Sequence, residues 1–148
     1  MDKAEERDNS RAGVGDNLSY LIEDLDIVFS QYIRQKYANN DGRVNCYTCS
    51  WNGHWKQSEC GHYIKRGHYG LRWDDRNARP QCHECNCEKN GNKPIYTQTL
   101  ELEQPGITEE LEIIGRQVYN LSRSELKELL IELRRKLNIV KSKIKNQF

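Results

Sequence analysis

The sequence predicts an α+β fold in which a small metal-stabilised module lies between an amino-terminal helix and a carboxy-terminal helical extension. Apolar residues recur at helical spacing on both sides of residues 43–94, whereas that segment contains only short strand-like pieces separated by turns. All six cysteines and all four histidines lie within it. We therefore expect a flexible acidic arm over residues 1–16, a helix plus the module over residues 17–94, and a linker with helices over residues 95–148.

Composition favours one compact domain with appendages rather than one large core. The chain has 148 residues, of which 36% are hydrophobic and 30% are charged. It contains no run of roughly 18 apolar residues, and its first residues form no apolar signal-peptide region. These absences predict a cytoplasmic protein with no membrane partner. Because reducing compartments keep thiols free, six cysteines in such a chain predict metal binding rather than disulfides.

Charge is segregated along the chain, although the formal net charge is only +1. Residues 27–94 carry 11 basic and 6 acidic side chains, and residues 134–148 carry 6 basic and none that are acidic. Residues 1–26 and residues 95–133 each carry 3 basic and 8 acidic side chains. Since the field depends on where the charges lie, the near-neutral sum does not exclude a nucleic-acid partner.

Residues 17–37 have the periodicity of an amphipathic helix. Their apolar positions are spaced by three and four residues: Leu18, Leu21, Ile22, Leu25, Val28, Phe29, Tyr32 and Ile33. Residues 39–42 are turn formers and end the helix. We expect this helix to pack on the module that follows.

The middle module is expected to have short strands and one short helix. A strand-like piece covers residues 61–64, and residues 82–89 are expected to be helical. Pro80 is expected to stop strand pairing before the second cysteine cluster, because proline has no N–H to donate.

Residues 95–148 predict a linker and two helices. Pro94 and Pro105 mark the linker, and Thr108 with the acids after it predicts a helix over residues 108–120. Ser122 and Glu125 have capping-box spacing and begin a last helix. Its apolar residues follow a heptad: Leu126, Leu130, Leu133, Leu137, Val140 and Ile144. Two partners fit this seam, an antiparallel hairpin with helix 108–120 and a homodimer.

Two C-x2-C pairs predict a structural zinc site with four thiolates: Cys46 and Cys49, Cys82 and Cys85. Each pair can form a knuckle whose thiolates approach one ion, and two knuckles complete the tetrahedral shell that zinc prefers.

The remaining cysteines leave other zinc arrangements open. Cys60 and His62 could complete a finger with the first C-x2-C pair, and a cross-braced module with two zinc ions would use further ligands. Cys87 could also simply pack beside the second knuckle.

Three residues between and after the knuckles are suited to phosphodiester hydrolysis. His62 lies in a strand-like piece, Asn77 follows it, and Asn86 comes directly after the last zinc ligand. An imidazole can take a proton from an attacking water, and an amide can hold that imidazole in position. A metal-ligating oxygen can hold a hard cation that stabilises charge on the scissile phosphate and the leaving oxygen.

These motifs resemble those of the HNH nucleases, the ββα-metal or His-Me finger endonucleases, in the variant whose third residue is Asn. The resemblance is closest to the NinG (Rap) recombination proteins of lambdoid phages and covers about residues 25–95. It lies in the following motifs: Phe29-x2-Tyr32-Ile33-Arg34, Cys46-x2-Cys49, Gly61-His62-Tyr63, Arg66-Gly67, Leu71-Arg72-Trp73, Gln81-Cys82, Cys85-Asn86, Lys89 and Gly91-Asn92.

The resemblance implies a structure-selective endonuclease that cuts branched DNA, such as D-loops and Holliday junctions, in the bacterial host cytoplasm with Mg²⁺ or Mn²⁺. His62 would be the general base, Asn86 a ligand of the catalytic metal, and Asn77 the residue that holds the loop so that His62 is aimed. Many HNH nucleases have an Asp directly before this His as a second metal ligand, whereas this chain has Gly61. The missing ligand could be Glu59, Asp74 or Asp75.

Basic side chains around the proposed centre are candidates for phosphate contacts: Lys65, Arg66, Arg72, Arg76, Arg79 and Lys89. Backbone contacts give affinity without reading sequence, which suits recognition of DNA shape. The basic end of the last helix could provide a second DNA contact. Two non-enzymatic alternatives stay open. One is a zinc module that binds DNA or a partner protein, and the other is a helical interaction protein in which zinc only stabilises the fold.

Overall fold

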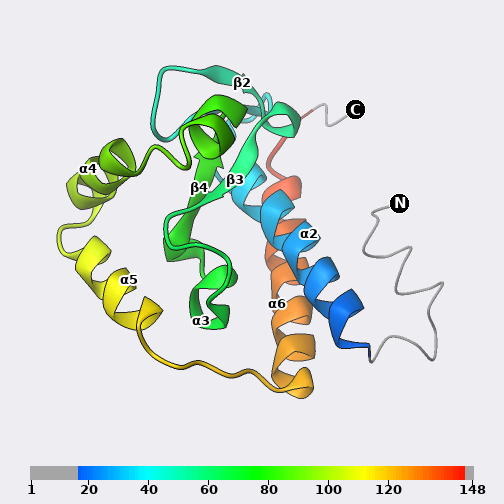
Figure 1. Ribbon diagram of the computed structural model, residues 1–148. Helices are drawn as coiled ribbons and strands as arrows, with labels where there is room; N and C mark the ends of the chain where they lie inside the picture. Colours follow the sequence, from blue (N-terminus) through cyan, green and yellow to red (C-terminus); the bar gives the residue numbers. More distant parts are fainter. Residues whose placement is uncertain (1–16, 146–148) are drawn as a thin grey trace.

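The computed structural model describes residues 17–145 and has the predicted α+β class (Figure 1). Its elements follow one another as α2 (Leu18–Lys36), β1 (Arg43–Asn45), β2 (Asn52–His54), η1 (Trp55–Gln57), β3 (Glu59–His62), α3 (Tyr69–Arg72), η2 (Asp75–Asn77), β4 (Ala78–Gln81), η3 (Glu84–Glu88), α4 (Lys93–Glu103), α5 (Ile107–Gly115) and α6 (Arg123–Lys141). The predicted arm over residues 1–16 lies outside the described residues. Within residues 17–145, no helix is long and apolar enough to cross a membrane.

Helices α2 and α6 lie side by side and build one hydrophobic core (Figure 1). Helix α2 begins where Asn17 Oδ1 accepts a hydrogen bond from the N–H of Ser19. Helix α6 begins at the predicted capping box of Ser122 and Glu125, which hydrogen-bond each other's backbone N–H. The apolar stripes of the two helices are buried together: Leu21, Leu25, Val28, Phe29 and Ile33 with Leu126, Leu130, Leu133, Leu137 and Val140.

The heptad of α6 therefore faces α2, and the hairpin with helix 108–120, one of the two partners considered for it, is not formed. Helix α5 packs instead against α3 and α4, because its buried residues Ile107 and Leu111 join a second core with Tyr96 and Leu100. The heptad leucines, which could have formed a homodimer seam, are buried within one chain. Their spacing thus has an intramolecular explanation.

Helix α4 occupies most of the segment that was expected to be a linker. Pro94 lies in its first turn, where a missing N–H breaks no helical hydrogen bond. Tyr96 and Leu100, four residues apart, bury one face of the helix. Gly106, with φ of 91°, makes the turn between α4 and α5. Proline at residue 94 thus starts a helix rather than extending a linker.

Strands β3 and β4 pair through Pro80, which corrects the expectation that Pro80 stops the pairing. The register places Glu59 opposite Gln81 and His62 opposite Ala78. The carbonyl of Pro80 points away from β3 and accepts a hydrogen bond from the N–H of Tyr47 at 2.9 Å. Because N–H and C=O of one strand residue point the same way, the missing N–H of Pro80 removes no bond to β3.

The β3–β4 pair is fixed from two sides. In Figure 1, α2 and α6 lie on one side of this pair and α4 and α5 on the other. Cys60 of β3 packs against the α2–α6 core. On the other side the hydroxyl of Tyr96, in α4, donates to the carbonyl of Gly61 at 2.8 Å. The fold thus holds β3 and its last residue, His62, between two helical layers.

The α2–α6 contact makes a stability prediction. Leu126→Ala should lower the free energy of unfolding by about 2–5 kcal/mol, because Leu126 is 0% exposed and its loss leaves a cavity. Ile131→Ala is the matched control, since Ile131 is 68% exposed on the same helix and its loss should cost less than about 0.5 kcal/mol. Urea unfolding followed by circular dichroism gives both values, and equal values for the two variants would contradict this packing.

Candidate functional site

Four cysteines converge from two distant segments of the chain. Cys46 and Cys49 follow β1, Cys82 and Cys85 follow β4, and their Sγ atoms all lie within 4.8 Å of one another. The N–H of Cys85 donates to Cys82 Sγ at 3.4 Å. This cluster could bind a metal ion such as zinc, as the two C-x2-C pairs predicted.

The polypeptide around the cluster supports thiolate ligands. The N–H of Trp51 donates to Cys49 Sγ at 3.4 Å. Burial raises the pKa of Cys49 and raises that of Cys82 to about 12, whereas at Cys46 hydrogen bonds from Cys82, Thr48 and Cys49 outweigh burial and lower the pKa to about 7. Cys60 and His62 lie apart from the cluster, on β3, so the alternative zinc finger that would use them is not formed.

His62 is held in one orientation at the end of β3. Its Nε2 lies 2.9 Å from the backbone carbonyl of Arg72, and its ring lies against Phe29 with centroids 5.8 Å apart. Because a carbonyl only accepts, Nε2 carries the proton in this hydrogen bond and Nδ1 is left with a lone pair. Burial lowers the pKa of His62 below its usual value of 6.5, which favours the neutral ring.

Asn77 closes the loop that connects β3 to β4. It is 0% exposed, and its Oδ1 accepts a hydrogen bond from the N–H of Ile64 at 2.8 Å. Its Nδ2 donates to the carbonyls of Ile64 and Leu71. These bonds fasten both ends of the loop, whose carbonyl at Arg72 binds His62.

Asn86 lies beside Glu59. The Nδ2 of Asn86, on η3, donates to Glu59 Oε1 at 2.8 Å, and the same carboxylate accepts bonds from His83 and Cys87. Burial alone would raise the pKa of Glu59, but the hydrogen bonds from Asn86 and His83 lower it. Glu59 therefore presents a carboxylate to η3 at neutral pH.

A cleft of about 500 Å³ brings His62, Asn86 and Glu59 together. It runs between α2, β3 and the chain around η3. Its lining residues are Asp26, Phe29, Ser30, Arg34, Ser58, Glu59, Cys60, His62, Lys65, Arg66, Asn86 and Gly91. The cleft thus combines an imidazole, two carboxylates, an amide and three basic side chains.

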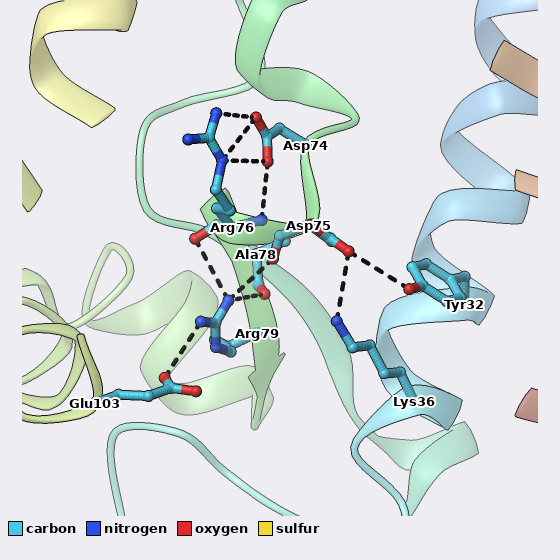
Figure 2. A network of polar contacts seen from close by, with 8 residues as sticks. All are labelled: Tyr32, Lys36, Asp74, Asp75, Arg76, Ala78, Arg79 and Glu103. Atoms are coloured by element: carbon cyan, nitrogen blue, oxygen red, sulfur yellow. Dashed lines mark hydrogen bonds and ion pairs between the residues drawn. The ribbon is translucent and has the colours of Figure 1, made fainter. Parts of the chain in front are cut away.

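Asp74 and Asp75 lie elsewhere and are engaged with other groups (Figure 2). Asp74 pairs with Arg76 at 2.7 Å. Asp75 accepts hydrogen bonds from Tyr32 at 3.5 Å and from Lys36 at 3.4 Å. Both acids line a second cavity between α2, α3 and α6, whereas the lining of the His62 cleft does not include them. Of the three candidate acids, Glu59 is the one beside Asn86.

The six basic candidates separate into two groups. Three of them bind acidic groups of the chain itself. Arg72 pairs with Asp26, and Arg76 pairs with both Asp74 and Glu110. Arg79 pairs with Glu103 and donates to several backbone carbonyls. Figure 2 shows the contact of Arg76 with Asp74 and the contacts of Arg79 with Glu103 and with the backbone. The side chain of Arg79 is only 8% exposed. Lys65 and Arg66 line the cleft, and Lys89 is exposed just after η3.

Asp26 is a residue that the motif analysis missed. Its carboxylate accepts hydrogen bonds from Arg72 Nη2 at 2.6 Å and from Trp73 Nε1 at 2.9 Å, and it lies 3.6 Å from Arg66. It thereby ties α2 to the segment whose carbonyl binds His62. Its sequence position could have indicated this role. Asp26 comes three residues before Phe29, so its carboxylate lies beside the apolar face of the predicted helix.

Gln81 occupies the space beside Gly61. A Cβ at Gly61 would lie only 1.9 Å from Gln81 Oε1, so no larger side chain fits while Gln81 keeps this position. Gln81 is fully buried and donates to Thr48 Oγ1 and to the carbonyl of Gly91. The glycine before His62 is therefore a packing requirement of this chain.

A comparison with protein families matches residues 1–143 to the family described as bacteriophage lambda NinG protein. The chain belongs to the NinG family. The match extends beyond the motifs of residues 25–95 and includes the NinG helices α4, α5 and α6. Searches of curated proteins and of solved structures gave no match.

The cysteine cluster of this NinG protein predicts a loss of metal and fold on substitution. Cys85→Ser should lose the zinc equivalent that survives dialysis in the wild type and should unfold the module, because metal binding supplies much of the folding free energy of such sites. Zinc analysis and circular dichroism measure both effects. Cys60→Ala, outside the cluster, should keep that zinc, and an unchanged zinc content in Cys85→Ser would contradict the assignment.

Proposed function

We propose that this protein is a metal-dependent DNA endonuclease that hydrolyses phosphodiesters in branched recombination intermediates such as D-loops and Holliday junctions. The observation that carries the proposal is that His62, Glu59 and Asn86 line one cleft, with the imidazole held by a backbone carbonyl. The pairing of β3 with β4, which α3 and η2 separate in the chain, and the position of η3 directly after β4 support it, since an HNH-like ββα arrangement has two paired strands and then a helix. Membership of the NinG family supports the substrate class.

His62 acts as the general base in this proposal. The hydrogen bond from Nε2–H to the Arg72 carbonyl leaves the lone pair of Nδ1 to take a proton from the attacking water. The lowered pKa of His62 keeps the ring neutral at physiological pH, so the base is in its active form before substrate binds. Asp26 and Asn77 are positioning residues, because they hold the segment that carries the Arg72 carbonyl.

Glu59 and Asn86 are proposed to hold the catalytic cation. A carboxylate and an amide oxygen are hard donors, which fits Mg²⁺ or Mn²⁺. When bound, such a cation supplies charge stabilisation at the scissile phosphate and the leaving oxygen. Glu59 takes the role that the Asp before the His has in many HNH nucleases, since Gln81 leaves no space for a side chain at Gly61.

DNA is proposed to lie along the basic side of the cleft. Arg34, Lys65 and Arg66 line the cleft. Lys89 is exposed and comes three residues after Asn86, which also lines it. Backbone phosphates are the partners that such side chains suit, and contacts of this kind follow DNA shape rather than sequence. The basic end of α6 is a candidate second contact, which a branched substrate with several arms could reach.

A non-enzymatic zinc module that binds DNA or a partner protein is the alternative. The observation that favours it is the absence of an acid at Gly61, whose place Gln81 fills. The two functions differ in one outcome, because only the endonuclease produces cut strands in a metal-dependent and His62-dependent manner.

The general-base role predicts a loss of cleavage without a loss of binding. His62→Ala should slow cleavage of a labelled Holliday junction in Mg²⁺ or Mn²⁺ by about 10²- to 10⁴-fold, because proton transfer contributes that much in such reactions. Junction affinity, measured by fluorescence anisotropy, should stay unchanged. His68→Gln is the matched control, since His68 lies outside the cleft and binds the carbonyl of Gln117. Identical products from wild type and His62→Ala would support the non-enzymatic alternative.

The choice of acid predicts a difference between two amide substitutions. Glu59→Gln should raise the Mg²⁺ concentration needed for half-maximal cleavage by about tenfold or more, because it removes a charged ligand. Asp75→Asn makes the same chemical change in the second cavity and should leave that concentration unchanged. A strong effect of Asp75→Asn with none for Glu59→Gln would move the metal site to the other cavity.

A further inference from the structure

The segment of residues 82–88, which contains η3, presents different ligands on its two sides. Cys82 and Cys85 turn toward the four-cysteine cluster. His83 and Cys87 turn instead toward Glu59 of β3, together with Asn86. In helical geometry positions three and four residues apart share a face, so the segment alternates between two groups of metal-ligating residues. The second group has no role in the zinc cluster.

The second group is compact. His83 Nδ1 lies 2.7 Å from Glu59 Oε2, and Cys87 Sγ lies 3.2 Å from Glu59 Oε1. One ligand atom from each of the three residues lies within 4.8 Å of the other two. The amide of Asn86 is a further polar group at 2.8 Å from Glu59 Oε1. Such distances fit three ligands around one ion.

We propose that Glu59, His83 and Cys87 form a second metal site, which binds a transition-metal ion of the zinc and cobalt class. The role of this ion rests on the proposed function, because Glu59 is shared with the proposed Mg²⁺ or Mn²⁺ site and an ion bound here would compete with the catalytic cation for this carboxylate. Its binding does not depend on that function.

The ligand chemistry selects this class of ion. Imidazole and thiolate prefer zinc, cobalt and similar metals, whereas Mg²⁺ prefers oxygen ligands alone. Three protein ligands from a carboxylate, an imidazole and a thiolate are the number that catalytic zinc sites use, with a further position for water or substrate. His83 and Cys87 are exposed, so that position faces solvent beside the cleft of His62 and Asn86.

Cobalt binding followed by absorption spectroscopy tests the site. Protein that holds its four-cysteine zinc should bind one further equivalent of Co²⁺ and develop a thiolate-to-cobalt charge-transfer band. Cys87→Ser should abolish the band, and His83→Gln should weaken Co²⁺ binding. Cys60→Ala should leave the band unchanged, because Cys60 packs into the α2–α6 core instead of facing Glu59. Zinc content measured in the same samples shows that the four-cysteine site has not exchanged.

The outcomes separate this site from the endonuclease proposal. A band that is lost in Cys87→Ser supports the site whether or not the protein cuts a junction. No band, or a band that Cys87→Ser leaves intact, overturns the site. Cleavage by the Mg²⁺ form together with no cobalt band would retain the endonuclease and reject the transition-metal site. A cobalt band without cleavage in any metal would retain the transition-metal site and reject the endonuclease.

Discussion

The convergence of four cysteines is the constraint on which the rest of the site depends. It joins the knuckle after β1 to the segment after β4, and the N–H of Tyr47 adds a backbone bond to the carbonyl of Pro80. This junction sets where η3 begins. The β3–β4 register places Glu59 opposite Gln81, which lies just before η3 in the chain. Asn86 of η3 therefore lies close enough to donate a hydrogen bond to Glu59. Cys85 is the one buried residue of η3, and the other side-chain contacts described for this helix are the hydrogen bonds of Asn86 and Cys87 to Glu59.

A second set of contacts aims the imidazole. Asp26 of α2 binds the Arg72 side chain, Asn77 binds the carbonyls of Ile64 and Leu71, and the Arg72 carbonyl binds His62. The imidazole of His62 is therefore oriented by contacts from a helix and from the loop between β3 and β4. Helix α2 therefore forms one wall of the cleft and also supplies the carboxylate that holds the Arg72 side chain.

Sequence reasoning predicted the parts whose signals are local. The periodicity of α2, the capping box at Ser122 and the C-x2-C pairs are each contained in a short window, and each was found in the structure. What could not be predicted depends on partners distant in sequence: the heptad of α6 packs on α2, and Glu59 rather than Asp75 lies beside Asn86. Arg79 looked like a phosphate ligand because its charge is visible in the sequence, whereas its burial against backbone carbonyls is not.

The location of a divalent ion and of DNA in one crystal tests the central claim most directly. The claim is that the cleft between α2, β3 and η3 is the place where a phosphodiester is hydrolysed. Crystals of the protein with a branched DNA and Mn²⁺ should give an anomalous peak between Glu59 and Asn86, with a backbone phosphate between that peak and His62. A peak beside Asp74 or Asp75, or DNA phosphates bound away from His62, would contradict it.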